Sequence, residues 1–320
     1  MKLLVPLNSI DWIDEMILAG ADEFYAGFYD DEWAQQYGSL SEINRMSGLS
    51  KRANNYTLSE ICNIGCKLKQ MGKSLYITLN APFYSESQLS RIADYISLLS
   101  TSSVEGIIVS CPAVAQIGVK AKMKVVCSTM CGIYNEDILD FYYDIGVNKI
   151  IFPRDMTIKE ISTLTEHRPD LQYEVFLMRN GCTYSDSNCL CMHRIPYRSL
   201  CGEISHAERK IISSDKTFQS IHDRTTNSFL YHSGYRAMAC GLCALYDFLK
   251  IGITSGKIVG RADDHQFIAE DVRLVAENLV IAQSSKNRNE YLENMKMPKY
   301  ASVSCLYGYS CYYPEIRFNT

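Results

Sequence analysis

The sequence lacks the features that mark membrane and exported proteins. None of its apolar runs approaches the roughly 20 residues that a membrane-spanning helix needs. The start, Met1-Lys2-Leu3-Leu4, is too brief an apolar stretch for a signal peptide, which predicts a cytoplasmic protein without membrane attachment. An excess of positive charge is also lacking, because 32 Lys and Arg stand against 36 Asp and Glu for a net charge of −4. The totals therefore do not indicate a nucleic-acid partner, although they leave a local basic patch open.

A glycine-rich phosphate or dinucleotide loop after the first β-rich run is missing as well, which disfavours a Rossmann-type sheet. Instead, short β-rich runs alternate with helix-like stretches along the chain. The eight predicted strands are 3–7, 23–27, 75–80, 106–110, 125–128, 149–153, 173–177 and 257–260. Eight such β–α units predict a closed (β/α)8 TIM-like barrel, with a doubly wound open sheet as the alternative.

The predicted strands divide the chain into four parts. Residues 1–179 carry barrel strands 1–7, and 255–299 carry strand 8 and the last helix. Between them, 180–254 is far longer than a normal connection and is predicted to be a cysteine-rich insertion. The aromatic tail, 300–320, is predicted to pack on the barrel. Because loops leaving the carboxyl ends of barrel strands form the active-site mouth, the insertion after strand 7 should lie there.

The cysteines are concentrated in this insertion. Of 13 cysteines, six lie between 182 and 243, and without an export signal they favour metal or redox chemistry over disulfides. Only Cys240 and Cys243 have the C-x2-C spacing typical of structural zinc. A more dispersed set suits a four-thiolate iron–sulfur cluster: Cys182, Cys189, Cys201 and Cys240. From spacing alone, a zinc site and ordinary buried thiols remain alternatives for these cysteines. Five other cysteines lie in apolar helix or strand patterns and are predicted to be small core residues: Cys62, Cys66, Cys111, Cys127 and Cys131.

Polar residues at predicted strand ends should face the mouth. The candidate ligand-binding residues are Tyr25, Asn80, Arg154, Arg179 and Arg261. The three arginines could converge on a carboxylate-bearing ligand, because a guanidinium group binds carboxylates bidentately. The alternative is that each arginine pairs with a nearby acid such as Asp155 or Asp263. For Lys257 we favour an interior ion pair with Glu174 on the adjacent strand.

Several motifs resemble peptidase family U32, the collagenase-like proteins that include ubiquinone-pathway and RNA hydroxylation proteins. They are GADEFYAG at 20–27, TLN at 78–80, PRD at 153–155, EVF at 174–176 and KIVGR at 257–261. The resemblance implies a [4Fe-4S] cluster on four cysteines and oxygen-independent hydroxylation. It favours Cys240, 17 residues before Lys257, over Cys243 as the last ligand. For the RNA-modifying branch it implies a prephenate-like anionic ligand as the oxygen source.

The chain also departs from the family pattern near the pocket. Met178-Arg179 stands where the family has His-Gly, and Val259 stands where it has Glu. We therefore expect an iron–sulfur-dependent hydroxylase or related redox enzyme acting on a small molecule, a peptide or a nucleobase. A related subunit or an electron-donor protein is the expected protein partner. The alternatives are a non-catalytic, cluster-stabilised subunit that presents substrate to another enzyme, and a zinc-stabilised barrel hydrolase. Cys191 or Cys243 could replace one of the chosen ligands.

Overall fold

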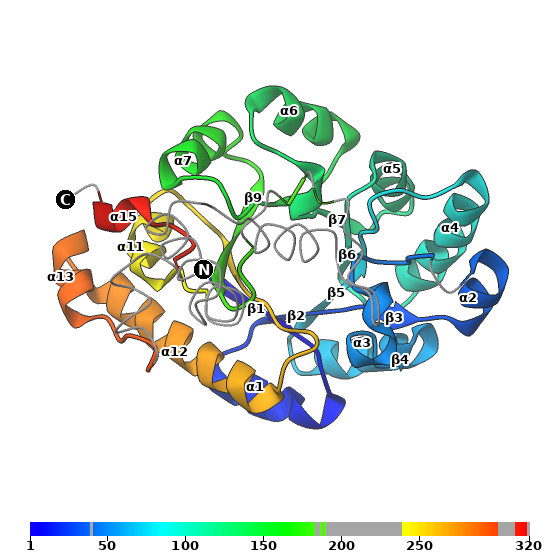
Figure 1. Cartoon of the computed structure of the whole chain (residues 1–320), viewed down its shortest axis with the longest axis horizontal. Helices are drawn as coiled ribbons and strands as arrows, with labels where there is room; N and C mark the ends of the chain where they lie inside the picture. Colours follow the sequence, from blue (N-terminus) through cyan, green and yellow to red (C-terminus); the bar gives the residue numbers. More distant parts are fainter. Residues whose placement is uncertain (39–40, 183–185, 188, 190–238, 300–310, 319–320) are drawn as a thin grey trace, which may run out of the picture.

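Eight parallel strands close into a barrel (Figure 1). The computed structural model describes residues 1–38, 41–182, 186–187, 189, 239–299 and 311–318. The strand order around the barrel is β1-β10-β9-β8-β7-β6-β5-β2. The strands are β1 (Lys2–Pro6), β2 (Glu23–Ala26), β5 (Ser74–Leu79), β6 (Gly106–Val109), β7 (Lys124–Cys127), β8 (Lys149–Ile151), β9 (Gln172–Met178) and β10 (Ser255–Ile258). All eight predicted strands are present, and closure of the barrel excludes the open-sheet alternative.

Helices surround the barrel on its outside (Figure 1). They are α1 (Ile13–Ala19), α3 (Leu58–Gln70), α4 (Glu86–Ser100), α5 (Pro112–Lys120), α6 (Glu136–Ile145), α7 (Ile158–His167), α11 (Leu245–Lys250), α12 (His265–Ser284) and α13 (Arg288–Asn294). Helix α7 begins at a capping box between Thr157 and Glu160, which supplies partners for amide groups that a helix start leaves unpaired. Among the described residues, no helix is both long and apolar enough to cross a bilayer.

The barrel interior contains a chain of buried charges. Lys149 Nζ lies 2.9 Å from Glu23 Oε2 and 3.6 Å from Glu174 Oε2. Lys257 Nζ lies 3.2 Å from Glu174 Oε1, which confirms the predicted interior pair. All four side chains are buried, so the two lysines balance the two carboxylates in a region with little water. Both carboxylates of the barrel core are therefore paired with lysines, and Lys2, whose side chain is largely exposed, adds a further pair with Glu23 Oε1 at 3.0 Å.

A long segment follows β2 on the mouth side of the barrel. It contains β3 (Phe28–Tyr29), α2 (Asp31–Tyr37), the 3-10 helix η2 (Ser47–Arg52) and β4 (Tyr56–Thr57). Strands β3 and β4 pair in parallel as a small separate sheet. Asn44 and Arg45, between α2 and η2, lie at the carboxyl ends of the barrel strands, where they contribute to the candidate site.

The chain leaves β9 through two consecutive residues in the left-handed region, Arg179 (φ 64°) and Asn180 (φ 48°). Most of the predicted insertion lies outside the described residues. Its last part forms η5 (Leu242–Ala244) and α11, which packs on α12 in the ring of helices. In the tail, α15 (Glu315–Phe318) follows an aromatic pair that contacts β9. Tyr312 stacks on Phe176 with ring centroids 5.8 Å apart, and the Tyr313 hydroxyl donates to the Phe176 carbonyl at 3.1 Å.

Candidate functional site at the barrel mouth

Tyr25, at the mouth end of β2, lies beside the uppermost charges of the interior. Lys257 Nζ lies 4.0 Å from the centre of the Tyr25 ring, and the Tyr25 hydroxyl donates to the Ile258 carbonyl at 3.4 Å. Burial raises the pKa of Tyr25 well above its usual value, and the positive charges of Arg261 and Arg154 offset part of this rise. Tyr25 is therefore a neutral hydroxyl, and both guanidinium groups are close enough to act on it.

Arg261 is the most deeply placed cation of the mouth, at 6% exposed. Its guanidinium donates to Thr78 Oγ1 at 2.9 Å, Asn44 Oδ1 at 3.1 Å and Asn54 Oδ1 at 3.4 Å, all of which are neutral acceptors. Among the described residues, no carboxylate forms an ion pair with it. Burial lowers the pKa of Arg261 to about 10, which still leaves it charged at neutral pH. The mouth thus contains a buried positive charge without a described negative partner.

Gly27, the last residue of the 20–27 motif, makes room for this arrangement. A Cβ atom at this position would overlap Asn54 Oδ1 and Arg261 Nη1. A side chain there would therefore displace the guanidinium or the asparagine that holds it. The motif has glycine at this position because the Arg261 guanidinium approaches the backbone too closely for a side chain.

Asp186 joins two further arginines at the mouth. Its Oδ1 accepts from Arg45 Nη1 at 3.0 Å and forms a short contact with Arg154 Nη1. The Asp186 side chain is fully buried, so burial opposes its charge. Arg154 and Arg45 nevertheless hold the pKa of Asp186 below its usual range. Arg154 also lies over the Phe176 ring, 3.9 Å from its centre, and its buried Nε has no partner among the described residues.

Arg45 connects this ion cluster to a predicted metal-binding cysteine and to Asn80. Its second guanidinium nitrogen, Nη2, donates to Cys189 Sγ at 3.3 Å. Its backbone N–H donates to Asn80 Oδ1 at 3.2 Å, and Asn80 Nδ2 donates to Ser128 Oγ at 3.2 Å. Residues from the segment after β2, from the ends of β5 and β7, and from the start of the insertion are thereby linked.

Arg179 does not join the other predicted arginines. Its Nε pairs with Asp271 on α12, and its Nη2 donates to the Phe267 carbonyl at 3.3 Å. The next residue, Asn180, donates to Asp263 Oδ2 at 2.6 Å. Burial raises the pKa of Asp271 to about 6, even though Arg179 favours its charged form. The structure therefore brings Tyr25, Asn80, Arg154 and Arg261 together, whereas the guanidinium of Arg179 binds a helix outside the barrel.

The predicted ligand cysteines are only partly described. Cys182 is half-buried and within electrostatic reach of Arg154, Cys189 is half-buried beside Arg45, and Cys240 is buried. Cys201 and the alternative ligand Cys191 lie outside the described residues. Within the described ranges, no three His, Cys, Asp or Glu side chains are placed to hold one metal ion. Thiols beside guanidinium groups are nevertheless suited in charge to an anionic thiolate centre.

The five cysteines predicted as small core residues differ in exposure. Cys127 is buried, and three others are half-buried, namely Cys62, Cys111 and Cys131. Cys66 is exposed on α3, so its predicted core position is wrong. It follows Gly65, which lies on the buried side of that helix, and the apolar residues around it misled the prediction.

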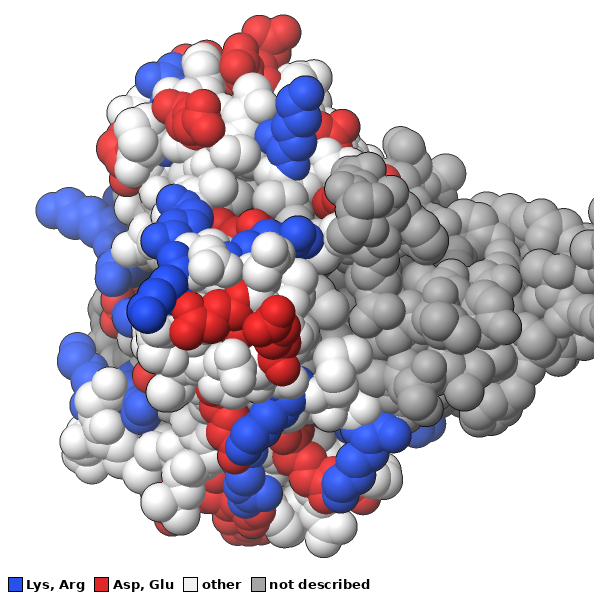
Figure 2. Space-filling view, turned by 90° about the vertical axis from the view of Figure 1, so that its left-hand side faces the viewer, with Lys and Arg blue, Asp and Glu red and all other residues white. Residues whose placement is uncertain are grey.

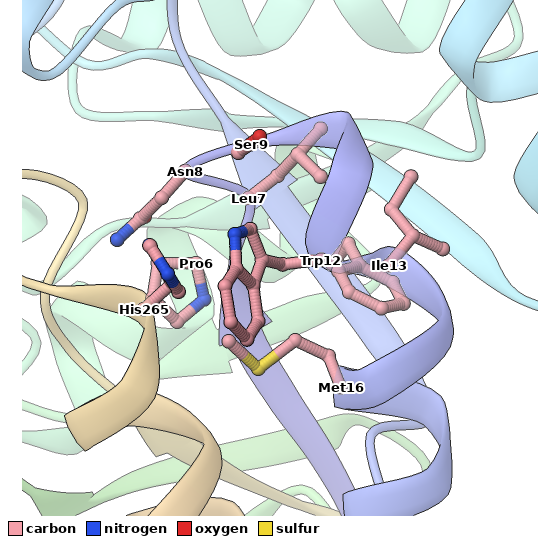
Figure 3. A pocket seen from close by; sticks show the side chains of 9 residues that line it. Pro6, Leu7, Asn8, Ser9, Trp12, Ile13, Met16 and His265 are labelled. Atoms are coloured by element: carbon pink, nitrogen blue, oxygen red, sulfur yellow. The ribbon is translucent and has the colours of Figure 1, made fainter.

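Two other hollows are less suited to a ligand. One lies at the mouth end of β1, where Asn8, Trp12 and His265 approach one another (Figure 3). Trp12 and His265 have ring centroids 3.6 Å apart, and the surrounding side chains leave essentially no room for a water molecule. The other is an open hollow of about 410 Å³ between the starts of α2 and α3 and the side of α4, with Asp30 bound to Arg91. Its wall combines apolar side chains such as Leu58 and Leu98 with four acids, of which Asp30 is already paired with Arg91.

Four residues of the mouth were not predicted from the sequence: Asn44, Arg45, Asn54 and Asp186. Three of them lie in the polar segment after β2, and Asp186 lies in the insertion, most of which is outside the described residues. None belongs to a spacing pattern that points to a site. The guanidinium groups of Arg45, Arg154 and Arg261 lie at the mouth. The carboxylate of Asp186 binds two of them, and the carboxylate of Asp263, which Asn180 binds, acts electrostatically on Tyr25.

Comparison with known proteins identifies related sequences. The model of Peptidase family U32 matches residues 8–318. The chain is 24% identical over 199 residues to tRNA hydroxylation protein P1 of Bacillus subtilis (strain 168), covering 62% of this chain and 43% of that protein. It is 22% identical over 312 residues to 23S rRNA 5-hydroxycytidine C2501 synthase of Escherichia coli (strain K12), covering 91% of this chain and 42% of that protein.

A third relative is named a collagenase, from Porphyromonas gingivalis (strain ATCC BAA-308 / W83). It is 22% identical over 52% of this chain and 36% of that protein. The chain thus spans less than half the length of these three curated relatives. Among solved structures, the U32 peptidase Mk0906 matches with a TM-score of 0.43 at 12% identity, covering 56% of this chain and 70% of that one.

Proposed function

The chain belongs to peptidase family U32, and from this membership and the cationic mouth we propose a hydroxylase that acts on an RNA nucleobase with the help of an anionic ligand. The relatives named as tRNA and rRNA hydroxylation proteins support the reaction and the substrate. The buried guanidinium of Arg261, which has only neutral partners among the described residues, is the observation that supports the anionic ligand. In its broader form, the proposal also includes a small molecule or a peptide as the substrate.

The anionic ligand would bind around Arg154 and Arg261. Arg261 is buried, is charged at neutral pH and has only neutral partners among the described residues. The Arg154 Nε donor is also buried without a described partner. Buried charges and donors of this kind favour an oppositely charged ligand, because a carboxylate supplies the missing acceptors in a region with little water. Tyr25 lies near both groups and could donate its hydroxyl to the same ligand.

We further propose that Cys182, Cys189, Cys201 and Cys240 hold a [4Fe-4S] cluster. The positions of Cys182 and Cys189 beside arginines support this, because cationic neighbours stabilise thiolates. When bound, such a cluster supplies one-electron transfer at a potential set by charge, hydrogen bonding and exposure. Arg45 would donate a hydrogen bond to one ligand sulfur while holding Asp186 in place.

Metal analysis tests the cluster directly. Anaerobically purified protein should be brown and contain about four irons per chain, because thiolate-to-iron charge transfer absorbs strongly. A colourless protein that contains zinc would support the zinc-hydrolase alternative instead. The reaction is tested by incubating iron-loaded protein with RNA, prephenate and a reductant, then searching by mass spectrometry for a nucleoside heavier by one oxygen atom.

Arginine variants test the ligand pocket. Arg154→Ala and Arg261→Ala should each weaken prephenate binding about tenfold to a hundredfold, because a charge-assisted contact contributes roughly 1.5–3 kcal/mol. Arg179→Ala is the matched control, since its guanidinium binds Asp271 outside the barrel. Calorimetry gives the affinities, and circular dichroism verifies the fold. If all three variants bound prephenate as the unaltered chain does, the pocket would have to lie elsewhere.

A non-catalytic role as a substrate-presenting subunit is the second candidate. It is favoured by Met178 and Arg179, which replace the family's His-Gly at the end of β9. Arg179 there takes up a left-handed backbone that glycine adopts without strain. Turnover by the purified chain alone would exclude this role, whereas turnover only with a related subunit would support it.

A further inference from the structure

Of the two interior lysines, Lys257 lies closer to the barrel mouth. It stands opposite Phe176 in the register of β10 and β9, whereas Lys149 stands opposite Gln172, at the amino end of β9. Because the barrel strands are parallel, the position further along β9 is nearer to the carboxyl ends that form the mouth. The Lys257 side chain is 8% exposed, compared with 3% for Lys149. Lys257 therefore has the more accessible of the two interior amines.

Three groups with complementary chemistry surround the Lys257 amine. Glu174 Oε1 accepts a hydrogen bond from Lys257 Nζ at 3.2 Å, so it can also take a proton from the ammonium group. The Tyr25 ring lies against the same nitrogen, with its centre 4.0 Å away. Arg261 acts electrostatically on both Lys257 and Tyr25. An amine, a proton acceptor, a phenol hydroxyl and a buried guanidinium group thus meet at one end of the barrel.

Burial makes Lys257 easier to deprotonate than an ordinary lysine. Desolvation lowers the pKa of Lys257, and Glu174 opposes only part of this shift. Burial also opposes the charge of Lys149, but Glu174 and Glu23 outweigh it and raise the pKa of Lys149. Each unit by which the pKa of an amine falls increases its neutral fraction about tenfold at neutral pH. The nucleophilic form is therefore easier to reach at Lys257 than at Lys149.

We propose that Lys257 forms an imine with a 2-oxo acid whose carboxylate binds Arg261. A 2-oxo acid carries a carboxylate next to a ketone, which matches a guanidinium group near a nucleophilic amine. Prephenate, the ligand proposed above, contains this group. The imine rests on that proposed ligand for the role of Arg261, and it adds a covalent step and a residue that performs it.

The step needs no oxidant or reductant. Lys257 passes a proton to Glu174, and the neutral amine attacks the ketone carbon to form a C–N bond. The nitrogen gives a second proton to the carbonyl oxygen, and Glu174 returns the first, so the oxygen leaves as water. A protonated imine remains, with one positive charge as in the original ammonium group. The Glu174 carboxylate and the Tyr25 ring face this charge as they faced the lysine.

Trapping with sodium cyanoborohydride tests the step, because this reagent reduces imines in preference to ketones. Unaltered protein is incubated with pyruvate and the reductant at neutral pH, then digested and mapped by mass spectrometry. We expect an adduct on Lys257 that adds one pyruvic acid less one oxygen atom. It should form about ten times faster, or more, than on Lys149, because the neutral amine is more abundant at Lys257. Lactate, which has the carboxylate but no ketone, is the control ligand and should give no adduct.

Two variants separate the roles of the amine and the guanidinium group. Lys257→Arg keeps a cation opposite Glu174 but cannot form an imine, so the adduct at this position should disappear. Arg261→Ala should slow trapping about tenfold at low pyruvate concentration, because the carboxylate contact is lost. Arg179→Ala, whose guanidinium binds Asp271 outside the barrel, is the matched control and should leave the rate unchanged. Circular dichroism verifies the fold of each variant.

Absence of an adduct on Lys257, or equal labelling of Lys257 and Lys149 in the unaltered protein, would overturn the inference even if no variant folds. An unchanged trapping rate in folded Arg261→Ala would refute the binding position of the 2-oxo acid. None of these measurements needs iron or RNA. An adduct in a chain that never hydroxylates RNA would refute the proposed reaction and leave this inference standing, whereas prephenate binding at Arg261 without any adduct would refute this inference alone.

Discussion

Replacing Asp186 by asparagine should destabilise the protein strongly, because one buried carboxylate holds two arginines. The side chain of Asp186 is fully buried, and those of Arg45 and Arg154 are 13% and 11% exposed. Asparagine keeps the size but removes the charge, which leaves two guanidinium groups facing a neutral amide. Removing one partner from a buried ion pair typically costs about 3–5 kcal/mol. We expect a loss of that order in the free energy of unfolding at pH 7, measured by urea denaturation.

The pH dependence of this loss provides a second check. Because the pKa of Asp186 is lowered in the folded state, its charge contributes stability above its unfolded pKa of about 4, and that contribution is lost as the pH falls further. The difference between the two proteins should therefore shrink on acidification below about pH 4. Asp155→Asn is the control, since Asp155 is exposed and accepts one hydrogen bond from Tyr134 at 2.7 Å; its cost should stay below about 1 kcal/mol. A loss at Asp186 no larger than the control would refute the reasoning.

Three further perturbations have definite expected outcomes. Gly27→Ala should displace Arg261, destabilise the chain by about 1–3 kcal/mol in urea denaturation and weaken prephenate binding in calorimetry. The pKa of Asp271 is raised to about 6, so the unaltered protein should lose stability as the pH rises from about 4 to 6, on the order of 3 kcal/mol. Asp271→Asn should abolish that slope in denaturation curves recorded across this range, whereas an unchanged slope would refute the assignment. Cys201→Ser should bleach anaerobically purified protein, and retention of colour and iron would remove Cys201 from the ligand set.

The location of the candidate site follows from the direction of the chain in the barrel. Arg261 follows β10, Arg154 follows β8 and Asn80 follows β5, and all strands are parallel. Their carboxyl ends therefore open on the same face, where loops converge. In the interior below, Lys149 and Lys257 are paired with Glu23 and Glu174. The buried guanidinium of Arg261, which has only neutral partners among the described residues, lies above this interior at the mouth.

The face of the molecule shown in Figure 2 adds little to this charge distribution. On the face shown in Figure 2, basic and acidic side chains are intermingled over the described part of the molecule. Such mixing agrees with the small net charge of −4. On this face, scattered charges of both signs do not form a phosphate-binding track for the proposed RNA substrate.

The sequence by itself predicted the barrel and the position of Lys257 in its interior, paired with Glu174. Each strand is a short β-rich run bounded by turns, and such runs can be recognised because the period of the apolar residues differs between a buried strand and a helix that packs on it. The Lys257–Glu174 pair was also predictable, since adjacent parallel strands bring aligned positions together. The ends of β5, β8 and β10 placed Asn80, Arg154 and Arg261 at the mouth for the same reason.

Only the tertiary structure decided which charges meet at the mouth. Arg45 lies in an irregular segment, and its partners Asp186 and Cys189 follow more than 140 residues later, so no local periodicity links them. The direction of Arg179 depended on its left-handed backbone, which turns the side chain toward Asp271 rather than into the mouth. The backbone β-bridge between Cys240 and Cys311 likewise arises from the return of the tail over β9. Contacts of this kind depend on how distant segments pack against one another, so the periodicity and spacing of the sequence do not indicate them.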